Sequence, residues 1–237
     1  MRTDVKDLYR RIDRACPQVG AFAHKIHSRR LSRHVRRAIR GTGNVVTHDG
    51  ALLDRVVFDI EGDRNRVEIG EGSRLHNVIF HIVGDRHRVV VGRDCVFSDG
   101  GMIWLEDRDG LLVIGPGSTF VDVHLALTEP GSRMTIGRDC MFANDIDVRT
   151  GDSHSIVSQK TGERLNYAQD VQVGDHVWVG AHSVLLKGTS IATNSVVATG
   201  AIVTGRHETE GVVLGGNPAR QVETGVTWCR RRLYRDP

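Results

Sequence analysis

The sequence predicts an all-β solenoid, and three observations lead to that fold class. First, an aliphatic residue recurs at every sixth position over 173–203, a period that neither an α-helix nor an alternating strand requires. These residues are Val173, Val179, Leu185, Ile191, Val197 and Val203. Second, four earlier segments share the pattern aliphatic, x, aliphatic, Gly, x, x, Ser/Cys, x, apolar; they are 67–75, 89–97, 112–120 and 134–142. Third, the 237 residues include 27 glycines and few aromatics, which suits many short strands and turns.

A six-residue unit is long enough for one short extended segment and one turn. Three units would close a triangular coil, and successive coils would stack at the ~4.8 Å spacing of paired strands. We expect the aliphatic side chain to point inward and the following turn to use Gly, Asn or Asp, for which positive φ is cheap. The small residue four positions after each aliphatic one would fit near a corner; these are Ser183, Thr189, Ser195 and Ala201.

The cysteines and the apolar content bound the class of protein. The four cysteines, Cys16, Cys95, Cys140 and Cys229, form no CxxC pair, so we expect neither a disulfide framework nor a structural zinc site. Cys95 and Cys140 occupy equivalent repeat positions, and we expect both to be small buried hydrophobes. There is no run of about 18 apolar residues and no stretch of signal-peptide type at the start, so we expect a cytoplasmic protein.

The N-terminal segment is basic. Residues 24–40 carry seven Lys or Arg and no acid. This stretch fits a solvated helix face, an acidic membrane surface or an anionic substrate; no aromatic stacking pattern accompanies it, so nucleic acid is not an expected partner. Apolar residues recur at near-helical spacing before it, and "GTG" at 41–43 would end a helix. Because the ends of a solenoid need caps, we expect residues 1–43 to form a helical cap.

The six-residue repeat and several longer motifs of the sequence resemble those of a known family. The six-residue repeat is similar to that of the hexapeptide-repeat acyltransferases over roughly residues 45–222, and "LGGNPARQV" (214–222) resembles the "GNPA" signature that closes their β-helix. "CMFANDIDVRTGDSHSI" followed by "VGDHVWVGAHSVLLKG" resembles the branch that O-acetylates sugars and polysaccharides, such as the galactoside and maltose acetyltransferases. The resemblance implies a left-handed parallel β-helix. We assign this domain to 44–222, with an inserted active-site loop at 149–170 and a basic C-terminal tail at 223–237.

The resemblance also implies a reaction. An O-acetyltransferase of this branch moves an acetyl group from acetyl-coenzyme A to a saccharide hydroxyl, in surface polysaccharide or cell-wall glycan modification. His154, in the interrupting loop, matches the family's general base, which takes the proton of the acceptor hydroxyl. The backbone amide of Ala181 matches the donor that stabilises the oxyanion. In the family the enzyme is a homotrimer with active sites between subunits.

Further residues are candidates for binding. Trp178, Ala181, Thr199 and Gly200 match positions that border or contact the coenzyme in the family. Arg206 and Arg220 suit its phosphates because guanidinium matches phosphate geometry. Asn217 and Pro218 belong to the "GNPA" signature. Related enzymes often carry Lys just after the last hexapeptide; in this chain that position is Gly205, and Arg206 follows it. Acetyl-coenzyme A is the expected co-substrate, and no metal is expected. Candidates for holding the acceptor or orienting His154 are Asn144, Asp145, Asp147, Arg149, Asp152 and Glu129.

Three alternatives remain open at the level of sequence. The acceptor could be an amino sugar or another small molecule, which would make the enzyme an N-acetyltransferase. A zinc-dependent, carbonic-anhydrase-like β-helix would need histidine ligands such as His76 and His81, or His176 and His182. A non-catalytic scaffold would keep the repeats without needing a loop that bears a histidine. The basic segment also leaves open a peripheral position at the inner face of a membrane.

Overall fold

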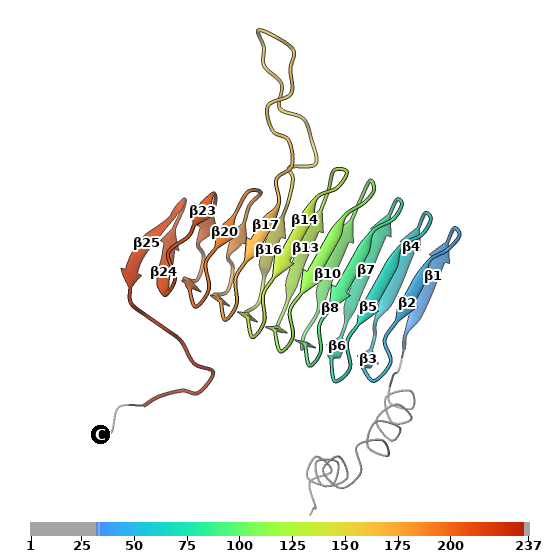
Figure 1. Ribbon diagram of the computed structural model, residues 1–237, viewed down its shortest axis with the longest axis horizontal. Helices are drawn as coiled ribbons and strands as arrows, with labels where there is room; N and C mark the ends of the chain where they lie inside the picture. The colour runs from blue at the N-terminus through green and yellow to red at the C-terminus, as the bar shows by residue number, and fades with distance from the viewer. Residues whose placement is uncertain (1–31, 33, 235–237) are drawn as a thin grey trace, which may run out of the picture.

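The computed structural model describes residue 32 and residues 34–234. These residues form strands and turns and contain no helix, so in this part of the chain no helix is long and apolar enough to cross a membrane. The strands build a stack of three-sided coils whose axis runs along the longest dimension of the molecule (Figure 1). The predicted all-β solenoid is therefore confirmed.

Three parallel sheets form the sides of the stack, and each coil contributes one strand to each sheet. Sheet B contains β1 (Arg36–Arg40), β4 (Val57–Glu61), β7 (Val78–Val83), β10 (Gly101–Leu105), β13 (Val123–Leu127), β16 (Ile146–Arg149), β19 (Val184–Leu185) and β22 (Ile202–Val203). Sheet C contains β2 (Val45–Thr47), β5 (Arg66–Ile69), β8 (Arg88–Val91), β11 (Leu111–Ile114), β14 (Arg133–Ile136), β17 (Val171–Val173), β20 (Ser190–Ile191) and β23 (Arg206–His207). Sheet A contains β3 (Leu52–Asp54), β6 (Arg74–His76), β9 (Val96–Phe97), β12 (Thr119–Phe120), β15 (Met141–Phe142), β18 (Trp178–Val179), β21 (Val196–Val197), β24 (Val212–Gly216) and the antiparallel β25 (Ala219–Thr224).

The sequence repeats set the register between coils. Ile69 pairs with Val91, Val91 with Ile114, and Ile114 with Ile136, so the four matching segments lie one above another. In the six-residue run, Val173 lies in sheet C, Val179 in sheet A and Leu185 in sheet B, and all three are buried. One coil later they pair with Ile191, Val197 and Val203. The predicted inward column of aliphatic residues is confirmed for this part of the stack.

The earlier coils are wider than the six-residue unit predicts. Their sheet B strands bury two or three apolar side chains each, for example Phe58 and Ile60 in β4. Sheet A adds a stack of phenyl rings, with centroids 4.4 Å apart for Phe97 and Phe120 and 4.9 Å apart for Phe120 and Phe142. The expectation of one inward aliphatic residue per segment is therefore wrong for these coils, because their sheet B strands span five or six residues, as in β4 and β7, and not two as in β19.

The corners between sheets C and A contain the recurring Ser or Cys position of the repeat pattern. The Ser73 hydroxyl donates to the Gly92 carbonyl oxygen at 2.8 Å and accepts from the Cys95 amide at 3.1 Å. The Cys95 thiol donates onward to the Gly115 carbonyl oxygen at 3.3 Å. Burial raises the pKa of the Cys95 and Cys140 thiols to about 11, so both stay protonated at neutral pH. Their predicted role as small buried residues is confirmed.

Two turns of the six-residue run use a residue that the pattern does not predict. Positive φ falls on Gly188, Asn194 and Gly200, as expected, but also on His176 and His182. Each imidazole reaches a carboxylate in the preceding coil: His176 Nδ1 lies 2.7 Å from Asp139, and His182 Nδ1 lies 2.8 Å from Asp145. The bonds to these carboxylates offset the backbone strain that a histidine meets at positive φ.

Part of the predicted helical cap is a strand. Residues 1–31 and residue 33 lie outside the described residues, but β1 pairs in parallel with β4 along its whole length. The helical prediction for 1–43 is therefore wrong over Arg36–Arg40, and the β-helix begins before residue 44. Strand β4 presents a row of backbone donors and acceptors, and pairing with them outweighs the near-helical spacing of apolar residues.

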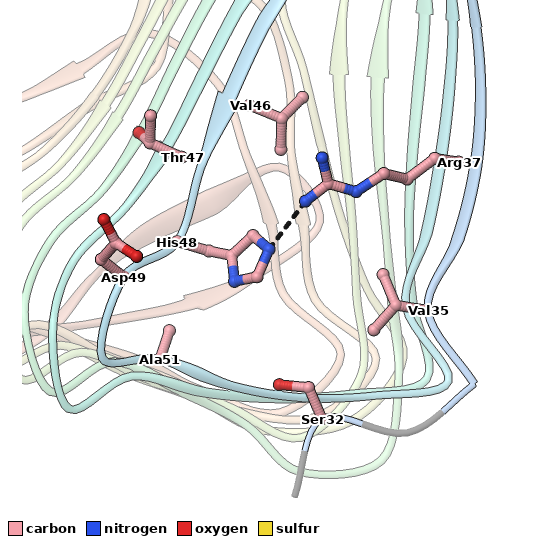
Figure 2. Close-up of a pocket in the computed structure, with 8 residues that line it drawn as sticks. All are labelled: Ser32, Val35, Arg37, Val46, Thr47, His48, Asp49 and Ala51. Carbon is pink, nitrogen blue, oxygen red and sulfur yellow. Dashed lines mark hydrogen bonds between the residues drawn. The ribbon is translucent and has the colours of Figure 1, made fainter. Parts of the chain in front are cut away.

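The N-terminal end of the stack is hollowed. A cavity of about 470 Å³ is lined by Ser32, Val35, Arg37, Val46, Thr47, His48, Asp49 and Ala51 (Figure 2). In it, Arg37 Nη2 lies 2.7 Å from His48 Nε2. Ile39 is 36% exposed, whereas Ile60, with which it pairs in the next coil, is fully buried, so the apolar column is less covered at this end.

The C-terminal tail runs back along the corner between sheets C and A. The Val226 amide donates to the Gly211 carbonyl oxygen, and the Trp228 indole stacks on His176 with centroids 4.3 Å apart. The Trp228 N–H donates to the His176 carbonyl oxygen at 2.8 Å, and Arg230 reaches Asp139 at 3.0 Å. The tail thus ties successive coils together.

Candidate active site

The predicted site residues fall on two different edges of the prism. We call the corner where the chain passes from sheet A to sheet B the A/B edge, and the corner where it passes from sheet B to sheet C the B/C edge. Ala181 follows β18 and lies at the A/B edge. His154 lies in the segment between β16 and β17, which leaves the stack at the B/C edge and projects far from it (Figure 1).

Four of the predicted coenzyme-binding residues gather at the A/B edge. Trp178 lies on the outer face of sheet A and is 37% exposed. The Gly200 amide donates to the Ala181 carbonyl oxygen at 2.8 Å, which places Thr199 and Gly200 directly beside Ala181 in the next coil. The Ala181 N–H has no acceptor within the described part of the chain. The amide donor of Ala181 thus lies at this edge, and the exposed indole of Trp178 lies on the neighbouring face of sheet A, with its ring centroid 6.3 Å from that of Trp228.

Two of the predicted acceptor-binding residues lie on the same edge, one coil earlier. The Asn144 carbonyl oxygen accepts from the His182 amide at 3.1 Å, and the Asp145 carboxylate faces His182 Nδ1. The side chains of Asn144 and Asp145 are both exposed. Asp145 has positive φ, so it is also a turn residue of the kind that the repeat uses.

At the B/C edge, the loop is tied to the stack by its first residue. The buried Thr150 donates its amide to the Ala126 carbonyl oxygen at 3.0 Å and accepts from the Gln169 amide at 2.9 Å. Its hydroxyl accepts from the Thr128 amide at 3.1 Å. These bonds bring the two ends of the loop together, as expected for an insertion into a continuous stack.

Asn166 is the central residue of the loop, and the sequence analysis missed it. Its side chain is 8% exposed, and its Nδ2 donates to the His154 carbonyl oxygen at 2.7 Å and to Asp152 at 2.8 Å. Its Oδ1 accepts from the Ile156 amide at 2.7 Å and from Arg164 Nε at 3.3 Å. Its position in the interruption was the only signal in the sequence, since hydrogen bonding within an irregular loop has no period.

Ion pairs attach the loop to the coils on both sides. Arg164 bonds Glu129 in the preceding coil, and Lys187 in the following coil bonds Asp152. The hydrogen bonds from Lys187 and Asn166 outweigh burial and lower the pKa of Asp152 below its usual range, so it is a carboxylate at neutral pH. Lys187 Nζ also donates to the Asn166 carbonyl oxygen at 3.1 Å.

None of the carboxylates considered as partners of His154 contacts its ring within one chain. Asp145 faces His182, Asp147 faces His124 and Arg149, Asp152 binds Lys187 and Asn166, and Glu129 binds Arg164. His154 is exposed, and no hydrogen bond joins its imidazole to another described residue. The loop thus fixes the backbone of His154 and leaves its ring available to a ligand or a second subunit.

Between the two edges, the outer face of sheet B carries a polar row. Burial alone would raise the pKa of Asp147, but hydrogen bonds from His124 and Arg149 outweigh it and lower the value to about 2. Arg149 Nε donates to Asp147 Oδ1 at 2.8 Å, so this predicted acceptor-binding pair is already joined. The Trp104 ring packs edge-on to His124, with centroids 6.4 Å apart.

Of the remaining predicted coenzyme contacts, Asn217 and Pro218 follow β24 at the end of sheet A that borders the A/B edge, whereas Arg206 lies elsewhere. Arg206 lies in sheet C and pairs with Glu208 at 2.7 Å. Asn217 and Pro218, linked by a cis peptide bond, form the turn of the β24–β25 hairpin at the end of sheet A, and Arg220 donates to the Ala219 carbonyl oxygen at 2.9 Å. The hairpin residues close the stack, whereas Arg206 faces a different side.

The histidine pairs considered for zinc are separated by the fold. His76 faces Asp54 in sheet A and His81 faces Asp59 in sheet B. His176 and His182 lie on different edges of one coil, each bound to its own aspartate. No group of three or more His, Cys, Asp or Glu that could hold a metal ion occurs in the described ranges.

Comparison with the sequences of known proteins identifies relatives over part of the chain. No family model matches the sequence. The chain is 28% identical over 99 residues to the polysialic acid O-acetyltransferase of Neisseria meningitidis, covering 40% of this chain and 46% of that protein. It is 38% identical over 64 residues to the galactoside O-acetyltransferase of Escherichia coli (strain K12), covering 27% of this chain and 30% of that protein. The matches span less than half the length of the curated relatives.

Solved structures extend the likeness over most of the chain. The polySia specific acetyltransferase NeuO is 25% identical, with a TM-score of 0.67 and 83% of each chain covered. The polysialic acid O-acetyltransferase OatWY is 23% identical, with a TM-score of 0.65, 84% of this chain and 92% of that chain covered, and shows the fold alone. The homologues of this chain are thus O-acetyltransferases of the hexapeptide-repeat family, as its six-residue period indicates.

Proposed function

We propose that the protein transfers an acetyl group from acetyl-coenzyme A to a hydroxyl of a saccharide, in surface polysaccharide or cell-wall glycan modification. The observation that carries the proposal is the Ala181 amide at the A/B edge, which has no acceptor in the described part of the chain. An amide fixed by a rigid coil is a preorganised donor for an oxyanion. The family to which the homologues belong supplies the reaction class.

In the proposed mechanism, His154 removes the proton of the acceptor hydroxyl as its oxygen attacks the thioester carbonyl. The Ala181 N–H donates to the carbonyl oxygen, which becomes negative in the tetrahedral intermediate. When the intermediate collapses, the C–S bond breaks, the acetyl ester forms, and the leaving thiolate takes the proton from His154. Acetyl-coenzyme A supplies the activated acetyl group.

The A/B edge fits an extended donor molecule. Gly180, Ala198 and Gly215 lie beside this edge in three successive coils, and a Cβ on Gly215 would lie 3.6 Å from Ala198 Cβ. Because two of these residues are glycines and the third is alanine, little side-chain volume covers this part of the edge. A long amide-bearing chain can lie along such a side, with Trp178 as its wall. Thr199 and Gly200 are exposed there and would contact it.

Two copies of the chain are required to assemble the proposed site. Within one chain, the sheet B strands separate the loop that carries His154 from the edge that carries Ala181. If a neighbouring chain places its A/B edge against the loop, its Ala181 meets this chain's His154. This supports the homotrimer with sites between subunits that the family resemblance implies.

The remaining parts of the proposal concern location and the ends of the stack. We further propose that the coils wind in the left-handed sense, that the N-terminal segment caps the stack, and that the protein lies in the cytoplasm at an anionic membrane face. Arg36–Arg40 is exposed, but Arg40 pairs with Glu61 at 2.9 Å, which reduces the free positive charge. Analytical ultracentrifugation tests the trimer, and co-sedimentation with anionic vesicles, which should fail once Arg36 and Arg37 are neutralised, tests the membrane contact.

The function itself is tested with a free-thiol assay on the full chain. Acetyl-coenzyme A and a panel of saccharides should release thiol at a rate that depends on the acceptor, and the product should gain the mass of one acetyl group. If no acceptor raises the rate and the coenzyme does not bind, the protein is a scaffold rather than a transferase.

Asn166→Ala should lower turnover roughly tenfold or more. The change removes the bonds that fix the His154 backbone, and misplacing a catalytic group by about 1 Å costs on the order of 10²-fold. Steady-state kinetics should show the loss in kcat, with coenzyme affinity and KM little changed. Lys160→Ala, at the exposed loop tip, is the matched control. Equal losses in both variants would mean that Asn166 only maintains the loop fold.

A further inference from the structure

A groove extends along the A/B edge away from the proposed donor position. Its volume is about 470 Å³, and edge residues of four successive coils line it: Asn77, Asp99 with Gly100, Asp122 and Asp145. Its end nearest to the proposed donor is Asp145, which bonds His182, the neighbour of Ala181. The groove therefore begins where transfer is proposed to occur and continues over three coil steps, about 14 Å at the ~4.8 Å strand spacing.

The charges of this groove are negative. No Lys or Arg is among its described lining residues, whereas Asp99, Asp122, Asp145 and Asp147 are. Asp99 and Asp122 have no side-chain hydrogen bond or ion pair with another residue that the structure describes. Asp145 faces His182, and Asp147, held ionised by its low pKa, is neutralised by Arg149. Two carboxylates thus remain available to donors on a ligand.

The groove also has an apolar component. Ile79 and Met102 lie on the outer face of sheet B and line the groove beside His124. Apolar surface next to hydrogen-bond acceptors suits a sugar ring, which has C–H faces and a rim of hydroxyl donors. A carboxylate-bearing sugar would meet like charges at Asp99 and Asp122 without a compensating cation.

We propose that this groove holds the acceptor saccharide chain, and that the chain is one with free hydroxyl donors and no negative charge. The inference rests on the proposed function and names the substrate class of that site. It separates this protein from the relatives whose names specify polysialic acid, a polyanion. The two unpaired aspartates select against anionic polymers, and the groove length favours several linked sugars over one.

Isothermal titration calorimetry of the full chain tests this without catalysis. The probes are hexamers of equal length: N-acetylglucosamine (neutral), glucosamine (amine-bearing) and α2,8-linked sialic acid (anionic). We expect the neutral hexamer to bind at least about tenfold more tightly than the sialic acid hexamer, and more tightly than N-acetylglucosamine itself. Tighter binding of the amine hexamer than the neutral one would identify charge attraction as the main source of affinity; both results support an acceptor without negative charge.

Reversing the charge of the two unpaired aspartates provides a second test of the proposal. Asp99→Lys combined with Asp122→Lys should reverse the preference between the neutral and sialic acid hexamers. Glu71→Lys, at an exposed corner outside the groove where Glu71 pairs with Arg93 at 3.8 Å, should not. Preference of the unmodified protein for sialic acid, an unchanged order in the double variant, or no binding of any hexamer would each overturn the inference. Thiol release with other acceptors would still support acetyl transfer, so the two failures are distinguishable.

Discussion

His154→Ala should lower acetyl transfer by at least about 10²-fold, because general base catalysis contributes roughly 10²–10⁴-fold. Coenzyme affinity should change little, since Trp178, Thr199 and Gly200, and not His154, are the proposed coenzyme contacts. Thiol-release kinetics measure the first quantity, and calorimetry with coenzyme A measures the second. Added imidazole should restore part of the turnover if the missing group is a base. His48→Ala, at a histidine that contacts Arg37 on the corner between sheets C and A, away from both edges, is the control.

His182 is the rival base, and its variant decides between the two. Asp145 orients His182 at 2.8 Å on the edge that carries Ala181, which is how a carboxylate prepares an imidazole for proton transfer. If His182→Ala abolishes turnover and His154→Ala leaves it near the unmodified level, the proposed mechanism is wrong and the site lies within one subunit. If only His154→Ala is inactive, the loop supplies the base.

Mixing inactive variants tests whether two subunits build each site. Ala181→Pro removes the amide donor, and Trp178→Ala alters the proposed cleft wall with less effect on the backbone. Either should be inactive or slow alone, yet regain activity when co-assembled with His154→Ala, because some interfaces then combine an intact loop with an intact A/B edge. Absence of recovery in verified mixed oligomers would contradict a site between subunits.

Phe120→Ala should destabilise the stack by about 3–5 kcal/mol, the usual cost of removing a buried phenyl ring. Phe120 is fully buried between Phe97 and Phe142 in neighbouring coils, so the cavity would lie in the middle of the sheet A column. In a solenoid each coil is stabilised mainly by its neighbours, and loss of one contact weakens the stack at that point. Denaturant and thermal unfolding followed by circular dichroism measure the effect.

The adjacent residue provides a matched control for the core prediction. Val121 directly follows Phe120 and is 39% exposed. Val121→Ala should therefore change the free energy of unfolding by less than about 0.5 kcal/mol. A loss below about 1 kcal/mol for Phe120→Ala would mean that the coils collapse around the gap, and that the phenyl column is not a principal source of stability.

Sequence reasoning recovered the stack because coils repeat along the chain. Val173, Val179 and Leu185 each pair with the equivalent residue of the next coil, so a period in sequence becomes a column in space. The buried corner positions of Cys95 and Cys140 followed for the same reason. The helical assignment over Arg36–Arg40 failed because only the neighbouring β4 strand decides that pairing.

The candidate site was less accessible to sequence reasoning. The family resemblance grouped Trp178, Ala181, Thr199 and Gly200, and in the structure Thr199 and Gly200 lie beside Ala181 in the next coil. Arg206 was grouped with them because it follows the position at which related enzymes often carry Lys, and it lies in sheet C. Asn166 and its four hydrogen bonds had no period or motif to reveal them, since they join parts of one irregular loop.

By itself, the sequence determined that short segments of fixed length stack on like segments and bury their inner side, because inward aliphatic residues recur once in each six-residue segment, three of which make a coil. The tertiary structure alone decided which edge each functional group occupies. His154 and Ala181 are 27 residues apart in sequence but lie on opposite sides of sheet B, since the loop leaves the stack at a different corner from the turn that holds Ala181. Position around the prism depends on strand and turn lengths, which the repeat pattern fixes only where it is unbroken.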